Sequence, residues 1–182
     1  TNHWLITSGL AMYLIVRLQK LRAESVLHPE QLRRLSSLYE ASALRTVELR
    51  RDLLALNERF SALGLPFANW KGFALEPDFC PDIRLRPQMD FDFIARPSDR
   101  APFHRTLLEA GYELTEVNGS ESRYDNLAGQ NYSLEDVYRP KPHRKVEIHF
   151  GTDGNPRWGQ VMDFEAALER RRHLTLEGTT FP

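Results

Sequence analysis

The first third of the chain places apolar residues at the spacing of an amphipathic helix. From Leu32 to Leu63, leucines and aromatic residues recur three or four positions apart, with arginines and glutamates between them. Because such positions lie on one face of a helix, residues 30–63 are expected to form one long helix or two with a break. Gly64 is a typical stop signal after it. A shorter helix is expected over residues 8–21, and both are interpreted as a scaffold for the rest of the chain.

Beyond Gly64 the pattern changes to short segments rich in branched and aromatic residues, which are typical of strands. Strands are expected over residues 66–70, 90–95, 112–117 and 145–150, and residues 131–138 are a further candidate. The polar stretch 118–130 and the proline-rich stretch before Asp90 are predicted to be loops. A helical first third followed by interleaved strands and helices indicates an α+β or mixed α/β fold.

Two more helices are expected in this second part, over residues 98–110 and 164–172. Ser98 or Asp99 is the predicted cap of the first, and Asp163 of the second. Three apolar side chains of the first helix are expected to face inward: Phe103, Leu107 and Leu108.

The composition agrees with a globular protein of this kind and excludes several other classes of protein. The chain has 182 residues, 41% hydrophobic and 27% charged, with a net charge of −1, which fits one globular domain, with or without an appended subdomain. So small a net charge gives no global attraction to nucleic acid or an anionic membrane. The single cysteine, Cys80, excludes a disulfide framework and fits a cytoplasmic location. The apolar run 10–16 is too short to span a bilayer, so no membrane partner is expected.

Asp90 and Asp92 are the first candidates for chemistry. Side chains two positions apart on a strand point to the same face, so both carboxylates share one face while Phe91 and Phe93 share the other. Two carboxylates side by side repel each other unless a cation neutralises them. Hard divalent ions such as Mg²⁺ prefer oxygen ligands, so the pair is interpreted as a metal cradle. The alternative is a polar strand edge that faces solvent.

The predicted strand 145–150 strengthens the metal interpretation. It alternates between apolar residues and two polar ones, Glu147 and His149. If it lies beside the Asp90 strand with matching faces, Glu147 supplies a third carboxylate, and three carboxylates can hold two divalent ions about 3.5–4 Å apart. His149 is a candidate contact for a phosphate or an acceptor. The alternatives are a salt-bridged Glu147 on a half-exposed strand and a His149 hydrogen-bonded within the polar layer.

Phosphate chemistry also needs cations, and the chain offers two candidates near these strands. Lys71 is followed by Gly72, which lets the backbone approach an anion closely. Arg86 lies four residues before Asp90 and carries a guanidinium fork suited to phosphate. Lys71, Gly72 and Arg86 are therefore the candidate phosphate-binding residues.

Four short motifs in a fixed order resemble the signatures of a known family. They are WKGFAL at residues 70–75, RPQMDFDFI at 86–94, AGY at 110–112 and VEIHF at 146–150. Together they resemble the uncharacterised nucleotidyltransferase family related to the DNA polymerase β-type superfamily. The resemblance covers residues 32–150, and the helical segment before the Lys-Gly strand is also similar.

This resemblance implies a nucleotidyltransferase core of the polymerase β type, with a short mixed sheet and helices on one side. Residues 1–64 would be a helical segment packed on a core of residues 65–182. Asp90 and Asp92 would be paired ligands of Mg²⁺ or Mn²⁺, with Glu147 as the third acidic ligand. The implied reaction moves a nucleoside monophosphate from an NTP such as ATP to an acceptor and releases pyrophosphate.

Two departures from the family pattern change these expectations. The wider superfamily has a Gly-Ser pair just before the Asp-x-Asp strand, whereas Pro87-Gln88-Met89 stands there in this chain. Phosphate binding is therefore expected to depend on Lys71 and Arg86. Members of the family usually continue into a further helical region, so this core is expected either to lack a C-terminal helical extension or to have a small acceptor-binding part.

Two rival functions remain open on the sequence. A metal-dependent nuclease also clusters carboxylates, but it often has lysine two residues after the glutamate, where this chain has His149. A catalytically silent module of the same fold, which binds NTP or docks a partner, is the main alternative. The acceptor could be a protein, an RNA, a sugar or a small molecule.

Overall fold

The computed structural model describes residues 2–76, 78–80, 82–127, 134–141, 143–151, 163–176 and 178–182. The chain divides by its contacts into two compact units. Unit 1 comprises Thr1–Arg51, Leu75–Met89 and Asn131–Pro142, and unit 2 comprises Asp52–Ala74, Asp90–Gln130 and His143–Pro182. Each unit is thus assembled from segments that are far apart in the sequence. The expected division into a helical segment 1–64 and a core 65–182 stays a prediction.

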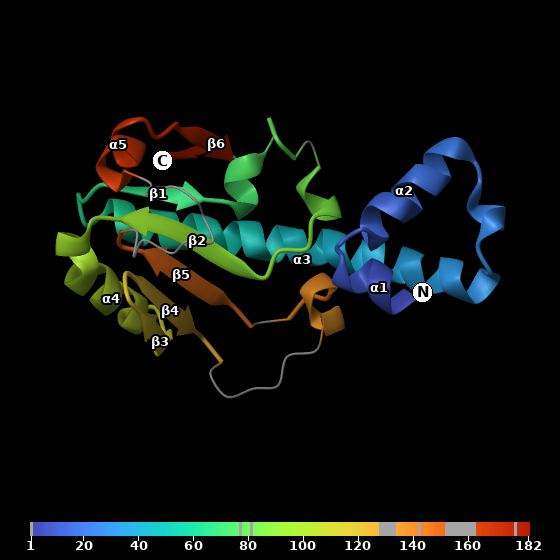
Figure 1. Ribbon diagram of the computed structural model, residues 1–182, viewed down its shortest axis with the longest axis horizontal. Coiled ribbons are helices and arrows are strands. Elements are labelled where there is room, and N and C mark those ends of the chain that lie inside the picture. The colour runs from blue at the N-terminus through green and yellow to red at the C-terminus, as the bar shows by residue number, and fades with distance from the viewer. Residues whose placement is uncertain are drawn as a thin grey trace. The chain divides into compact units, whose positions relative to one another are not determined.

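Unit 1 is helical (Figure 1). It contains α1 (Asn2–Thr7), α2 (Ala11–Leu21) and the first part of α3 (Pro29–Ser61), with short 3₁₀ helices at Glu24–Val26, Ile83–Leu85 and Leu134–Tyr138. Its apolar core surrounds Tyr138, whose hydroxyl donates to the carbonyl oxygen of Ile6 at 2.8 Å. The buried guanidinium of Arg45 donates to the carbonyl oxygens of Gln88 and Arg139. These three hydrogen bonds join the three segments of the unit.

Helix α3 is one continuous helix of 33 residues, which decides between the one-helix and two-helix predictions. Its apolar positions follow the helical period, and Leu35, Leu49 and Leu56 are all buried. The arginines and glutamates between them keep it polar overall. In the described part of the chain, no helix is long and apolar enough to cross a membrane.

Three local predictions for unit 1 need correction. The helix expected over residues 8–21 begins only at Ala11, as α2, and it follows a separate helix, α1, that was not predicted; Gly9, with a φ of +73°, lies between the two. The proline-rich stretch predicted to be a loop contains 3₁₀ helices at Gly72–Leu75, which belongs mostly to unit 2, and at Ile83–Leu85. Residues 134–138 of the candidate strand form a 3₁₀ helix, because Val137 and Tyr138 pack into the helical core. Residues 131–133 lie outside the described part.

Unit 2 is built on a five-stranded mixed sheet with the order β1-β2-β5-β4-β3. The strands are β1 (Phe67–Trp70), β2 (Asp90–Ala95), β3 (Glu113–Asn118), β4 (Glu121–Asp125) and β5 (Lys145–His149). The central pair, β2 and β5, is parallel, and the other neighbours are antiparallel. A separate two-stranded hairpin, β6 (Leu174–Leu176) and β7 (Thr179–Phe181), lies near the C-terminus and was not predicted.

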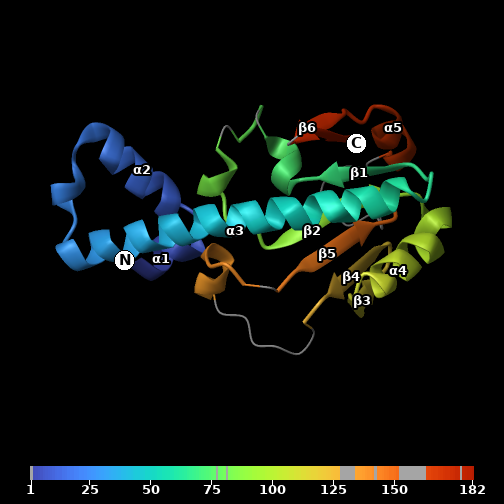
Figure 2. The same ribbon diagram turned by 180° about the vertical axis from the view of Figure 1, so that it is seen from behind.

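Aromatic side chains form the core behind one face of the sheet. Phe60 near the end of α3 contacts Phe67 of β1, Phe93 of β2 and Phe103 of α4 (Arg100–Glu109), with ring centroids 4.9–5.7 Å apart. Figure 2 shows the end of α3 and α4 on this side of the sheet. The phenylalanines of the Asp-Phe-Asp-Phe segment are therefore buried, as their alternation predicts, and Asp90 and Asp92 are left for the opposite face.

The opposite face is partly covered by α5 (Phe164–Glu169). Phe164 and Leu168 of this helix pack with Ala68 of β1 and Ile94 of β2. Because Ile94 shares its face with Asp92, α5 closes one end of the carboxylate-bearing face. The prediction of helices on one side of the sheet thus describes α3 and α4, and α5 is an addition on the other side.

The polar stretch 118–130 contains a strand where a loop was predicted. Glu121–Asp125 forms β4, paired with both β3 and β5, and Gly119 with a φ of +59° makes the turn from β3. The sequence of β4, Glu-Ser-Arg-Tyr-Asp, has few apolar residues. It is held because Ser122 and Tyr124 are buried on one face and both of its edges are hydrogen-bonded. Residues 128–130 lie outside the described part.

The two predicted helix caps differ in outcome. The carboxylate of Asp163 accepts a hydrogen bond from the Ala166 amide at 3.0 Å, which confirms it as the cap of α5. Asp99 stands at the cap position of α4 but makes no side-chain capping bond, and it accepts one from the Ser98 hydroxyl instead. The inward assignment is right for Phe103 and Leu107 and wrong for Leu108, which is exposed.

Leu107 and Leu108 give a matched test of this packing, because they are neighbours in one helix with 0% and 47% exposure. Leu107→Ala is expected to lower the free energy of unfolding by about 2–5 kcal/mol, since it leaves a cavity in the core. Leu108→Ala is expected to change it by less than about 1 kcal/mol. Guanidinium denaturation of both variants measures the difference, and equal losses would contradict the packing described.

Candidate metal site

The pairing of β2 with β5 places acidic residues opposite each other in the centre of the sheet. Asp92 is the partner of Glu147, and Ile94 is the partner of His149. Cross-strand partners share a face, so Asp92, Glu147 and His149 lie on the same side. The sequence predicted this arrangement only on the condition that the two strands are neighbours with matching faces, and the structure meets that condition.

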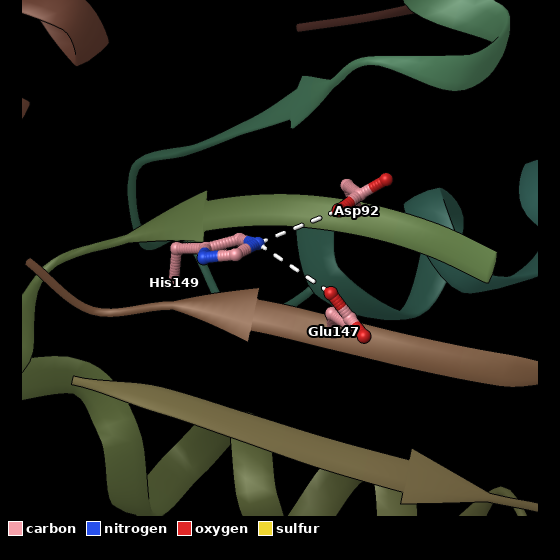
Figure 3. Close-up of side chains that lie close together, drawn as sticks. All are labelled: Asp92, Glu147 and His149. Carbon is pink, nitrogen blue, oxygen red and sulfur yellow. Dashed lines mark hydrogen bonds and ion pairs between the residues drawn. The ribbon is translucent and has the colours of Figure 1, made fainter. Parts of the chain in front are cut away.

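The three side chains converge (Figure 3). One ligand atom from each of Asp92, Glu147 and His149 lies within 4.8 Å of the other two. The histidine Nε2 is 3.4 Å from Asp92 Oδ1 and 4.0 Å from Glu147 Oε2. The Asp92 side chain is only 3% exposed, and those of His149 and Glu147 are 13% and 19% exposed. This is a compact and largely buried group of possible metal ligands.

Asp90 lies on the same strand face, half-buried, with Lys145 as its partner on β5. It is close enough to raise the pKa of Glu147 by charge repulsion, but it is not in the group of three within 4.8 Å. Its role as a metal ligand stays a prediction. The structure brings His149 into the group instead, a residue that the sequence offered as a phosphate or acceptor contact.

Lys71 reaches this group from the end of β1. Its ammonium is 2.8 Å from Asp92 Oδ1 and 4.7 Å from the centre of the Trp70 ring. The backbone of Lys71 has a φ of +63°, followed by +51° at Gly72. A left-handed conformation costs a lysine of order 1 kcal/mol, and such conformations collect at functional sites. The strained turn is what places the ammonium over the carboxylate.

Arg86, the other candidate phosphate ligand, belongs to unit 1, whereas the carboxylates belong to unit 2. Its guanidinium donates to Gln88 Oε1 at 2.9 Å. A role for Arg86 in phosphate binding stays a prediction.

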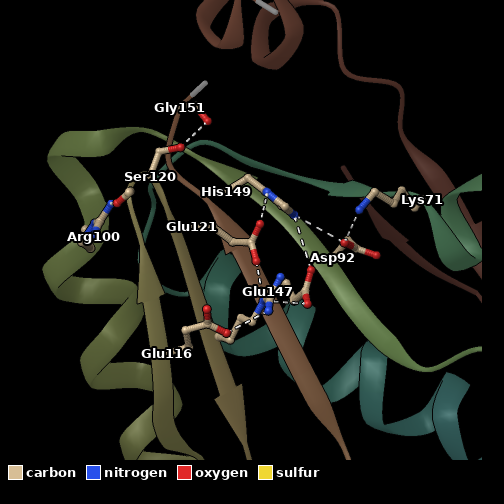
Figure 4. Close-up of polar contacts among 11 residues, drawn as sticks. Lys71, Asp92, Arg100, Glu116, Ser120, Glu121, Glu147, His149 and Gly151 are labelled. Carbon is tan, nitrogen blue, oxygen red and sulfur yellow. Dashed lines mark hydrogen bonds and ion pairs between the residues drawn. The ribbon is translucent and has the colours of Figure 1, made fainter. Parts of the chain in front are cut away.

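Two site residues on β4 escaped sequence reasoning, Glu121 and Arg123 (Figure 4). The guanidinium of Arg123 pairs with Glu121 Oε1 at 2.5 Å, with Glu147 Oε1 at 3.1 Å and with Glu116 Oε2 at 2.8 Å. The second carboxylate oxygen of Glu121 is 3.6 Å from Nδ1 of His149. The sequence signal for these two residues is their alternation with Ser122 and Tyr124, which are both buried. This alternation is not visible as a strand pattern because serine is polar.

Comparison with known proteins identifies the family. Residues 2–182 match the model of a protein family described as "uncharacterised nucleotidyltransferase". The chain belongs to this nucleotidyltransferase family. No curated protein and no solved structure matched it. The match confirms the resemblance read from the four motifs, and it extends over the helical segment as well as the strands.

The electrostatics of this candidate metal site are dominated by crowded carboxylates. Burial raises the pKa of Glu147, and the charges of Asp90, Glu121 and Asp92 raise it further, while Arg123 opposes them. Lys71 and Arg123 offset part of the negative charge by direct ion pairs with Asp92 and Glu147. A cation among these carboxylates is stabilised by the same charge density that disfavours ionised Glu147.

The donor set fits a divalent ion. Asp92 and Glu147 offer carboxylate oxygens, the preferred ligands of Mg²⁺ and Mn²⁺, and His149 offers an imidazole nitrogen. The group comes from two adjacent strands at the centre of a sheet, so its backbone is held rigidly. Of the expected ligands, Asp92 and Glu147 are therefore well placed to share one ion.

Glu147→Gln is expected to raise the free energy of unfolding at pH 7 in a buffer containing EDTA. The pKa of Glu147 is raised above its ordinary value of 4.5 in the folded chain, so the unfolded chain loses its proton first as pH rises. Glu147 thus favours the folded state below pH 4.5, and this contribution is lost as pH rises through the folded-state pKa. The increase in the free energy of unfolding that Glu147→Gln produces should therefore become smaller as the pH falls toward 4.5.

Urea denaturation between pH 4 and pH 8 measures this dependence. Glu116→Gln is the matched control, because it removes another glutamate bound to Arg123 but one that is about half exposed. A Glu147→Gln variant that is less stable than the wild type at pH 7 would show that the Arg123 pair outweighs the crowding.

Proposed function

We propose that the chain is a metal-dependent nucleotidyltransferase that moves a nucleoside monophosphate from an NTP to an acceptor hydroxyl and releases pyrophosphate. The observation that carries the proposal is the convergence of Asp92, Glu147 and His149 on one face of the central strand pair. Family membership supplies the reaction class. The acceptor is left open among a protein side chain, an RNA end, a sugar and a small molecule.

Asp92 and Glu147 would hold the ion, with Asp90 beside them on β2. A bound Mg²⁺ or Mn²⁺ neutralises triphosphate oxygens and lowers the pKa of an acceptor hydroxyl, and two such ions align the in-line attack. Arg123 holds one carboxylate oxygen of Glu147 and leaves the other directed toward His149. An alternative role for Glu147 is general base, and its raised pKa brings it nearer to neutral pH, where a base works best.

Lys71 is assigned to the triphosphate. Its ammonium shares Asp92 Oδ1 with the histidine, so a divalent ion bound to that oxygen would repel it. Phosphate oxygens are the natural new partner for the displaced charge. Lys71 thereby replaces part of the phosphate grip that a Gly-Ser pair supplies elsewhere in the superfamily, and Gly72 leaves room for the backbone to approach.

One observation favours the alternative, a catalytically silent module that binds NTP or docks a partner. Asp92 is paired with Lys71 at 2.8 Å and Glu147 with Arg123 at 3.1 Å. In a silent module these pairs would be permanent and would replace the ion. The nuclease alternative gains nothing, because no lysine follows Glu147 at the required position.

The direct test incubates the protein with Mg²⁺ or Mn²⁺, each α-labelled NTP in turn, and cell extract as the source of acceptors. Label transfer is expected with the wild type. Asp92→Asn is expected to lower it by more than about 100-fold, because losing a ligand costs more than the about 10–100-fold lost with an outer partner. Asp90→Asn should also lower it, and Glu116→Gln should leave it unchanged. Transfer that persists in Asp92→Asn would overturn the assigned site.

Lys71→Met distinguishes an active nucleotidyltransferase from a catalytically silent module by its effects on Mn²⁺ binding and on NTP binding. Without nucleotide, removal of the ammonium is expected to tighten Mn²⁺ binding by about threefold to tenfold, because a competing charge on Asp92 is lost. With Mn²⁺ present, NTP binding is expected to weaken. Calorimetry measures both, and Lys141→Met, which removes a lysine paired with Asp136 in unit 1, is the control. In a silent module, Lys71→Met would leave NTP binding unchanged.

A further inference from the structure

We propose that His149 is itself a ligand of the divalent ion through Nε2, and that Glu121 is the positioning residue that orients its ring. This inference rests on the proposed metal site and goes beyond it, because the resemblance implied carboxylate ligands alone. It assigns a function to a strand, β4, that the sequence did not reveal.

The two ring nitrogens of His149 have different surroundings (Figure 4). Nε2 faces the metal-ligand oxygens, at 3.4 Å from Asp92 Oδ1 and 4.0 Å from Glu147 Oε2. Nδ1 faces away from them, at 3.6 Å from Glu121 Oε2. A histidine binds a metal through the lone pair of one nitrogen while the other N–H points to a carboxylate or carbonyl. The carboxylate of Glu121 stands where that outer partner is required.

Three contacts fix the ring in this orientation. His149 is the register partner of both Glu121 on β4 and Ile94 on β2, so its backbone is paired on both sides. The Trp70 ring meets the imidazole edge to face, with centroids 4.8 Å apart and planes at 86°. A ring held by paired strands and an aromatic wall loses little freedom when it binds an ion.

Glu121 is in turn held by Arg123, which also pairs with Glu147. A single guanidinium therefore connects the outer carboxylate with a metal-ligand carboxylate. This places a second layer of charge around the ion, of the kind that keeps ligands oriented in metal sites. Arg123 leaves Glu121 Oε2 for the histidine because the guanidinium is bonded to the other oxygen, Oε1.

A nitrogen ligand changes which ions the site prefers. Mg²⁺ favours oxygen donors, whereas imidazole suits transition ions, so two carboxylates and one imidazole favour Mn²⁺ relative to a site of three carboxylates. The neutral imidazole also adds no negative charge to the crowded group. We therefore expect the ratio of Mn²⁺ to Mg²⁺ affinity to fall in His149→Gln, whose amide offers an oxygen in place of the nitrogen.

Pulsed electron paramagnetic resonance of the Mn²⁺-loaded protein tests the ligand directly. The wild type is expected to show the coupling of one imidazole nitrogen to the ion. His149→Gln should lose this coupling, and its Mn²⁺ affinity should fall by about tenfold or more. The matched control is His104→Gln, which changes a histidine that contacts Tyr124. This variant should keep both the nitrogen coupling and the Mn²⁺ affinity of the wild type. Mn²⁺ bound without nitrogen coupling would overturn the inference and leave the proposed metal site standing.

Glu121 and Glu116 form the matched pair for the positioning role, because both pair with Arg123 but only Glu121 faces His149. Glu121→Ala is expected to weaken Mn²⁺ binding by about 10–100-fold, and Glu116→Ala to leave it nearly unchanged. Glu121→Gln keeps an oxygen that can accept a hydrogen bond from Nδ1–H and should retain most of the affinity.

Nitrogen-15 chemical shifts of His149 give a readout that loss of stability alone would not move. The wild type should carry its proton on Nδ1, and Glu121→Ala should shift the population toward the Nε2 tautomer. Equal effects of Glu121→Ala and Glu116→Ala on affinity and tautomer would overturn the positioning role. If the wild type binds no Mn²⁺ with or without NTP, the inference and the proposed function fail together, whereas transfer activity with no nitrogen coupling removes the inference alone.

Discussion

The parallel pairing of β2 with β5 is the interaction on which the site depends. It sets Asp92 opposite Glu147 and brings His149 close enough for ligand atoms of all three to lie within 4.8 Å of one another. A slip of one residue in this register would turn one strand's polar side chains to the aromatic core. The buried phenylalanines on the other face prevent that slip, so the packing of the core also fixes the geometry of the carboxylates.

This arrangement places several carboxylates close together in a largely buried position, which is unfavourable for folding. The pKa of Glu147 is raised because burial and neighbouring carboxylates disfavour its charge. Lys71 and Arg123 offset part of that repulsion, one from a strained turn and the other from β4. Strain and crowded charge both lower stability, and their concentration at one face of the sheet is the pattern expected of a functional site.

Patterns with a strong local cause were predictable. The alternation of Asp90 to Phe93 and of the strand 145–150 gave both strands and the correct faces, and the long helix α3 followed from its apolar period. Strand β4 was not predictable, because its five residues look polar and are held by neighbours on both edges. Because β4 was not predicted, Glu121, which lies beside His149, and Arg123, which pairs with Glu147, were not predicted either.

The sequence by itself therefore determined the family, the α+β class and the faces of the strands that carry Asp92 and Glu147, because motif order and side-chain alternation are local properties. Whether β2 and β5 are neighbours, and in which register, was decided by tertiary structure, since this pairing joins segments more than fifty residues apart. The same holds for the position of His149 beside Asp92 and Glu147 and for the pairing of Lys71 with Asp92. Distances between side chains on different strands follow only once the hydrophobic core has fixed the sheet.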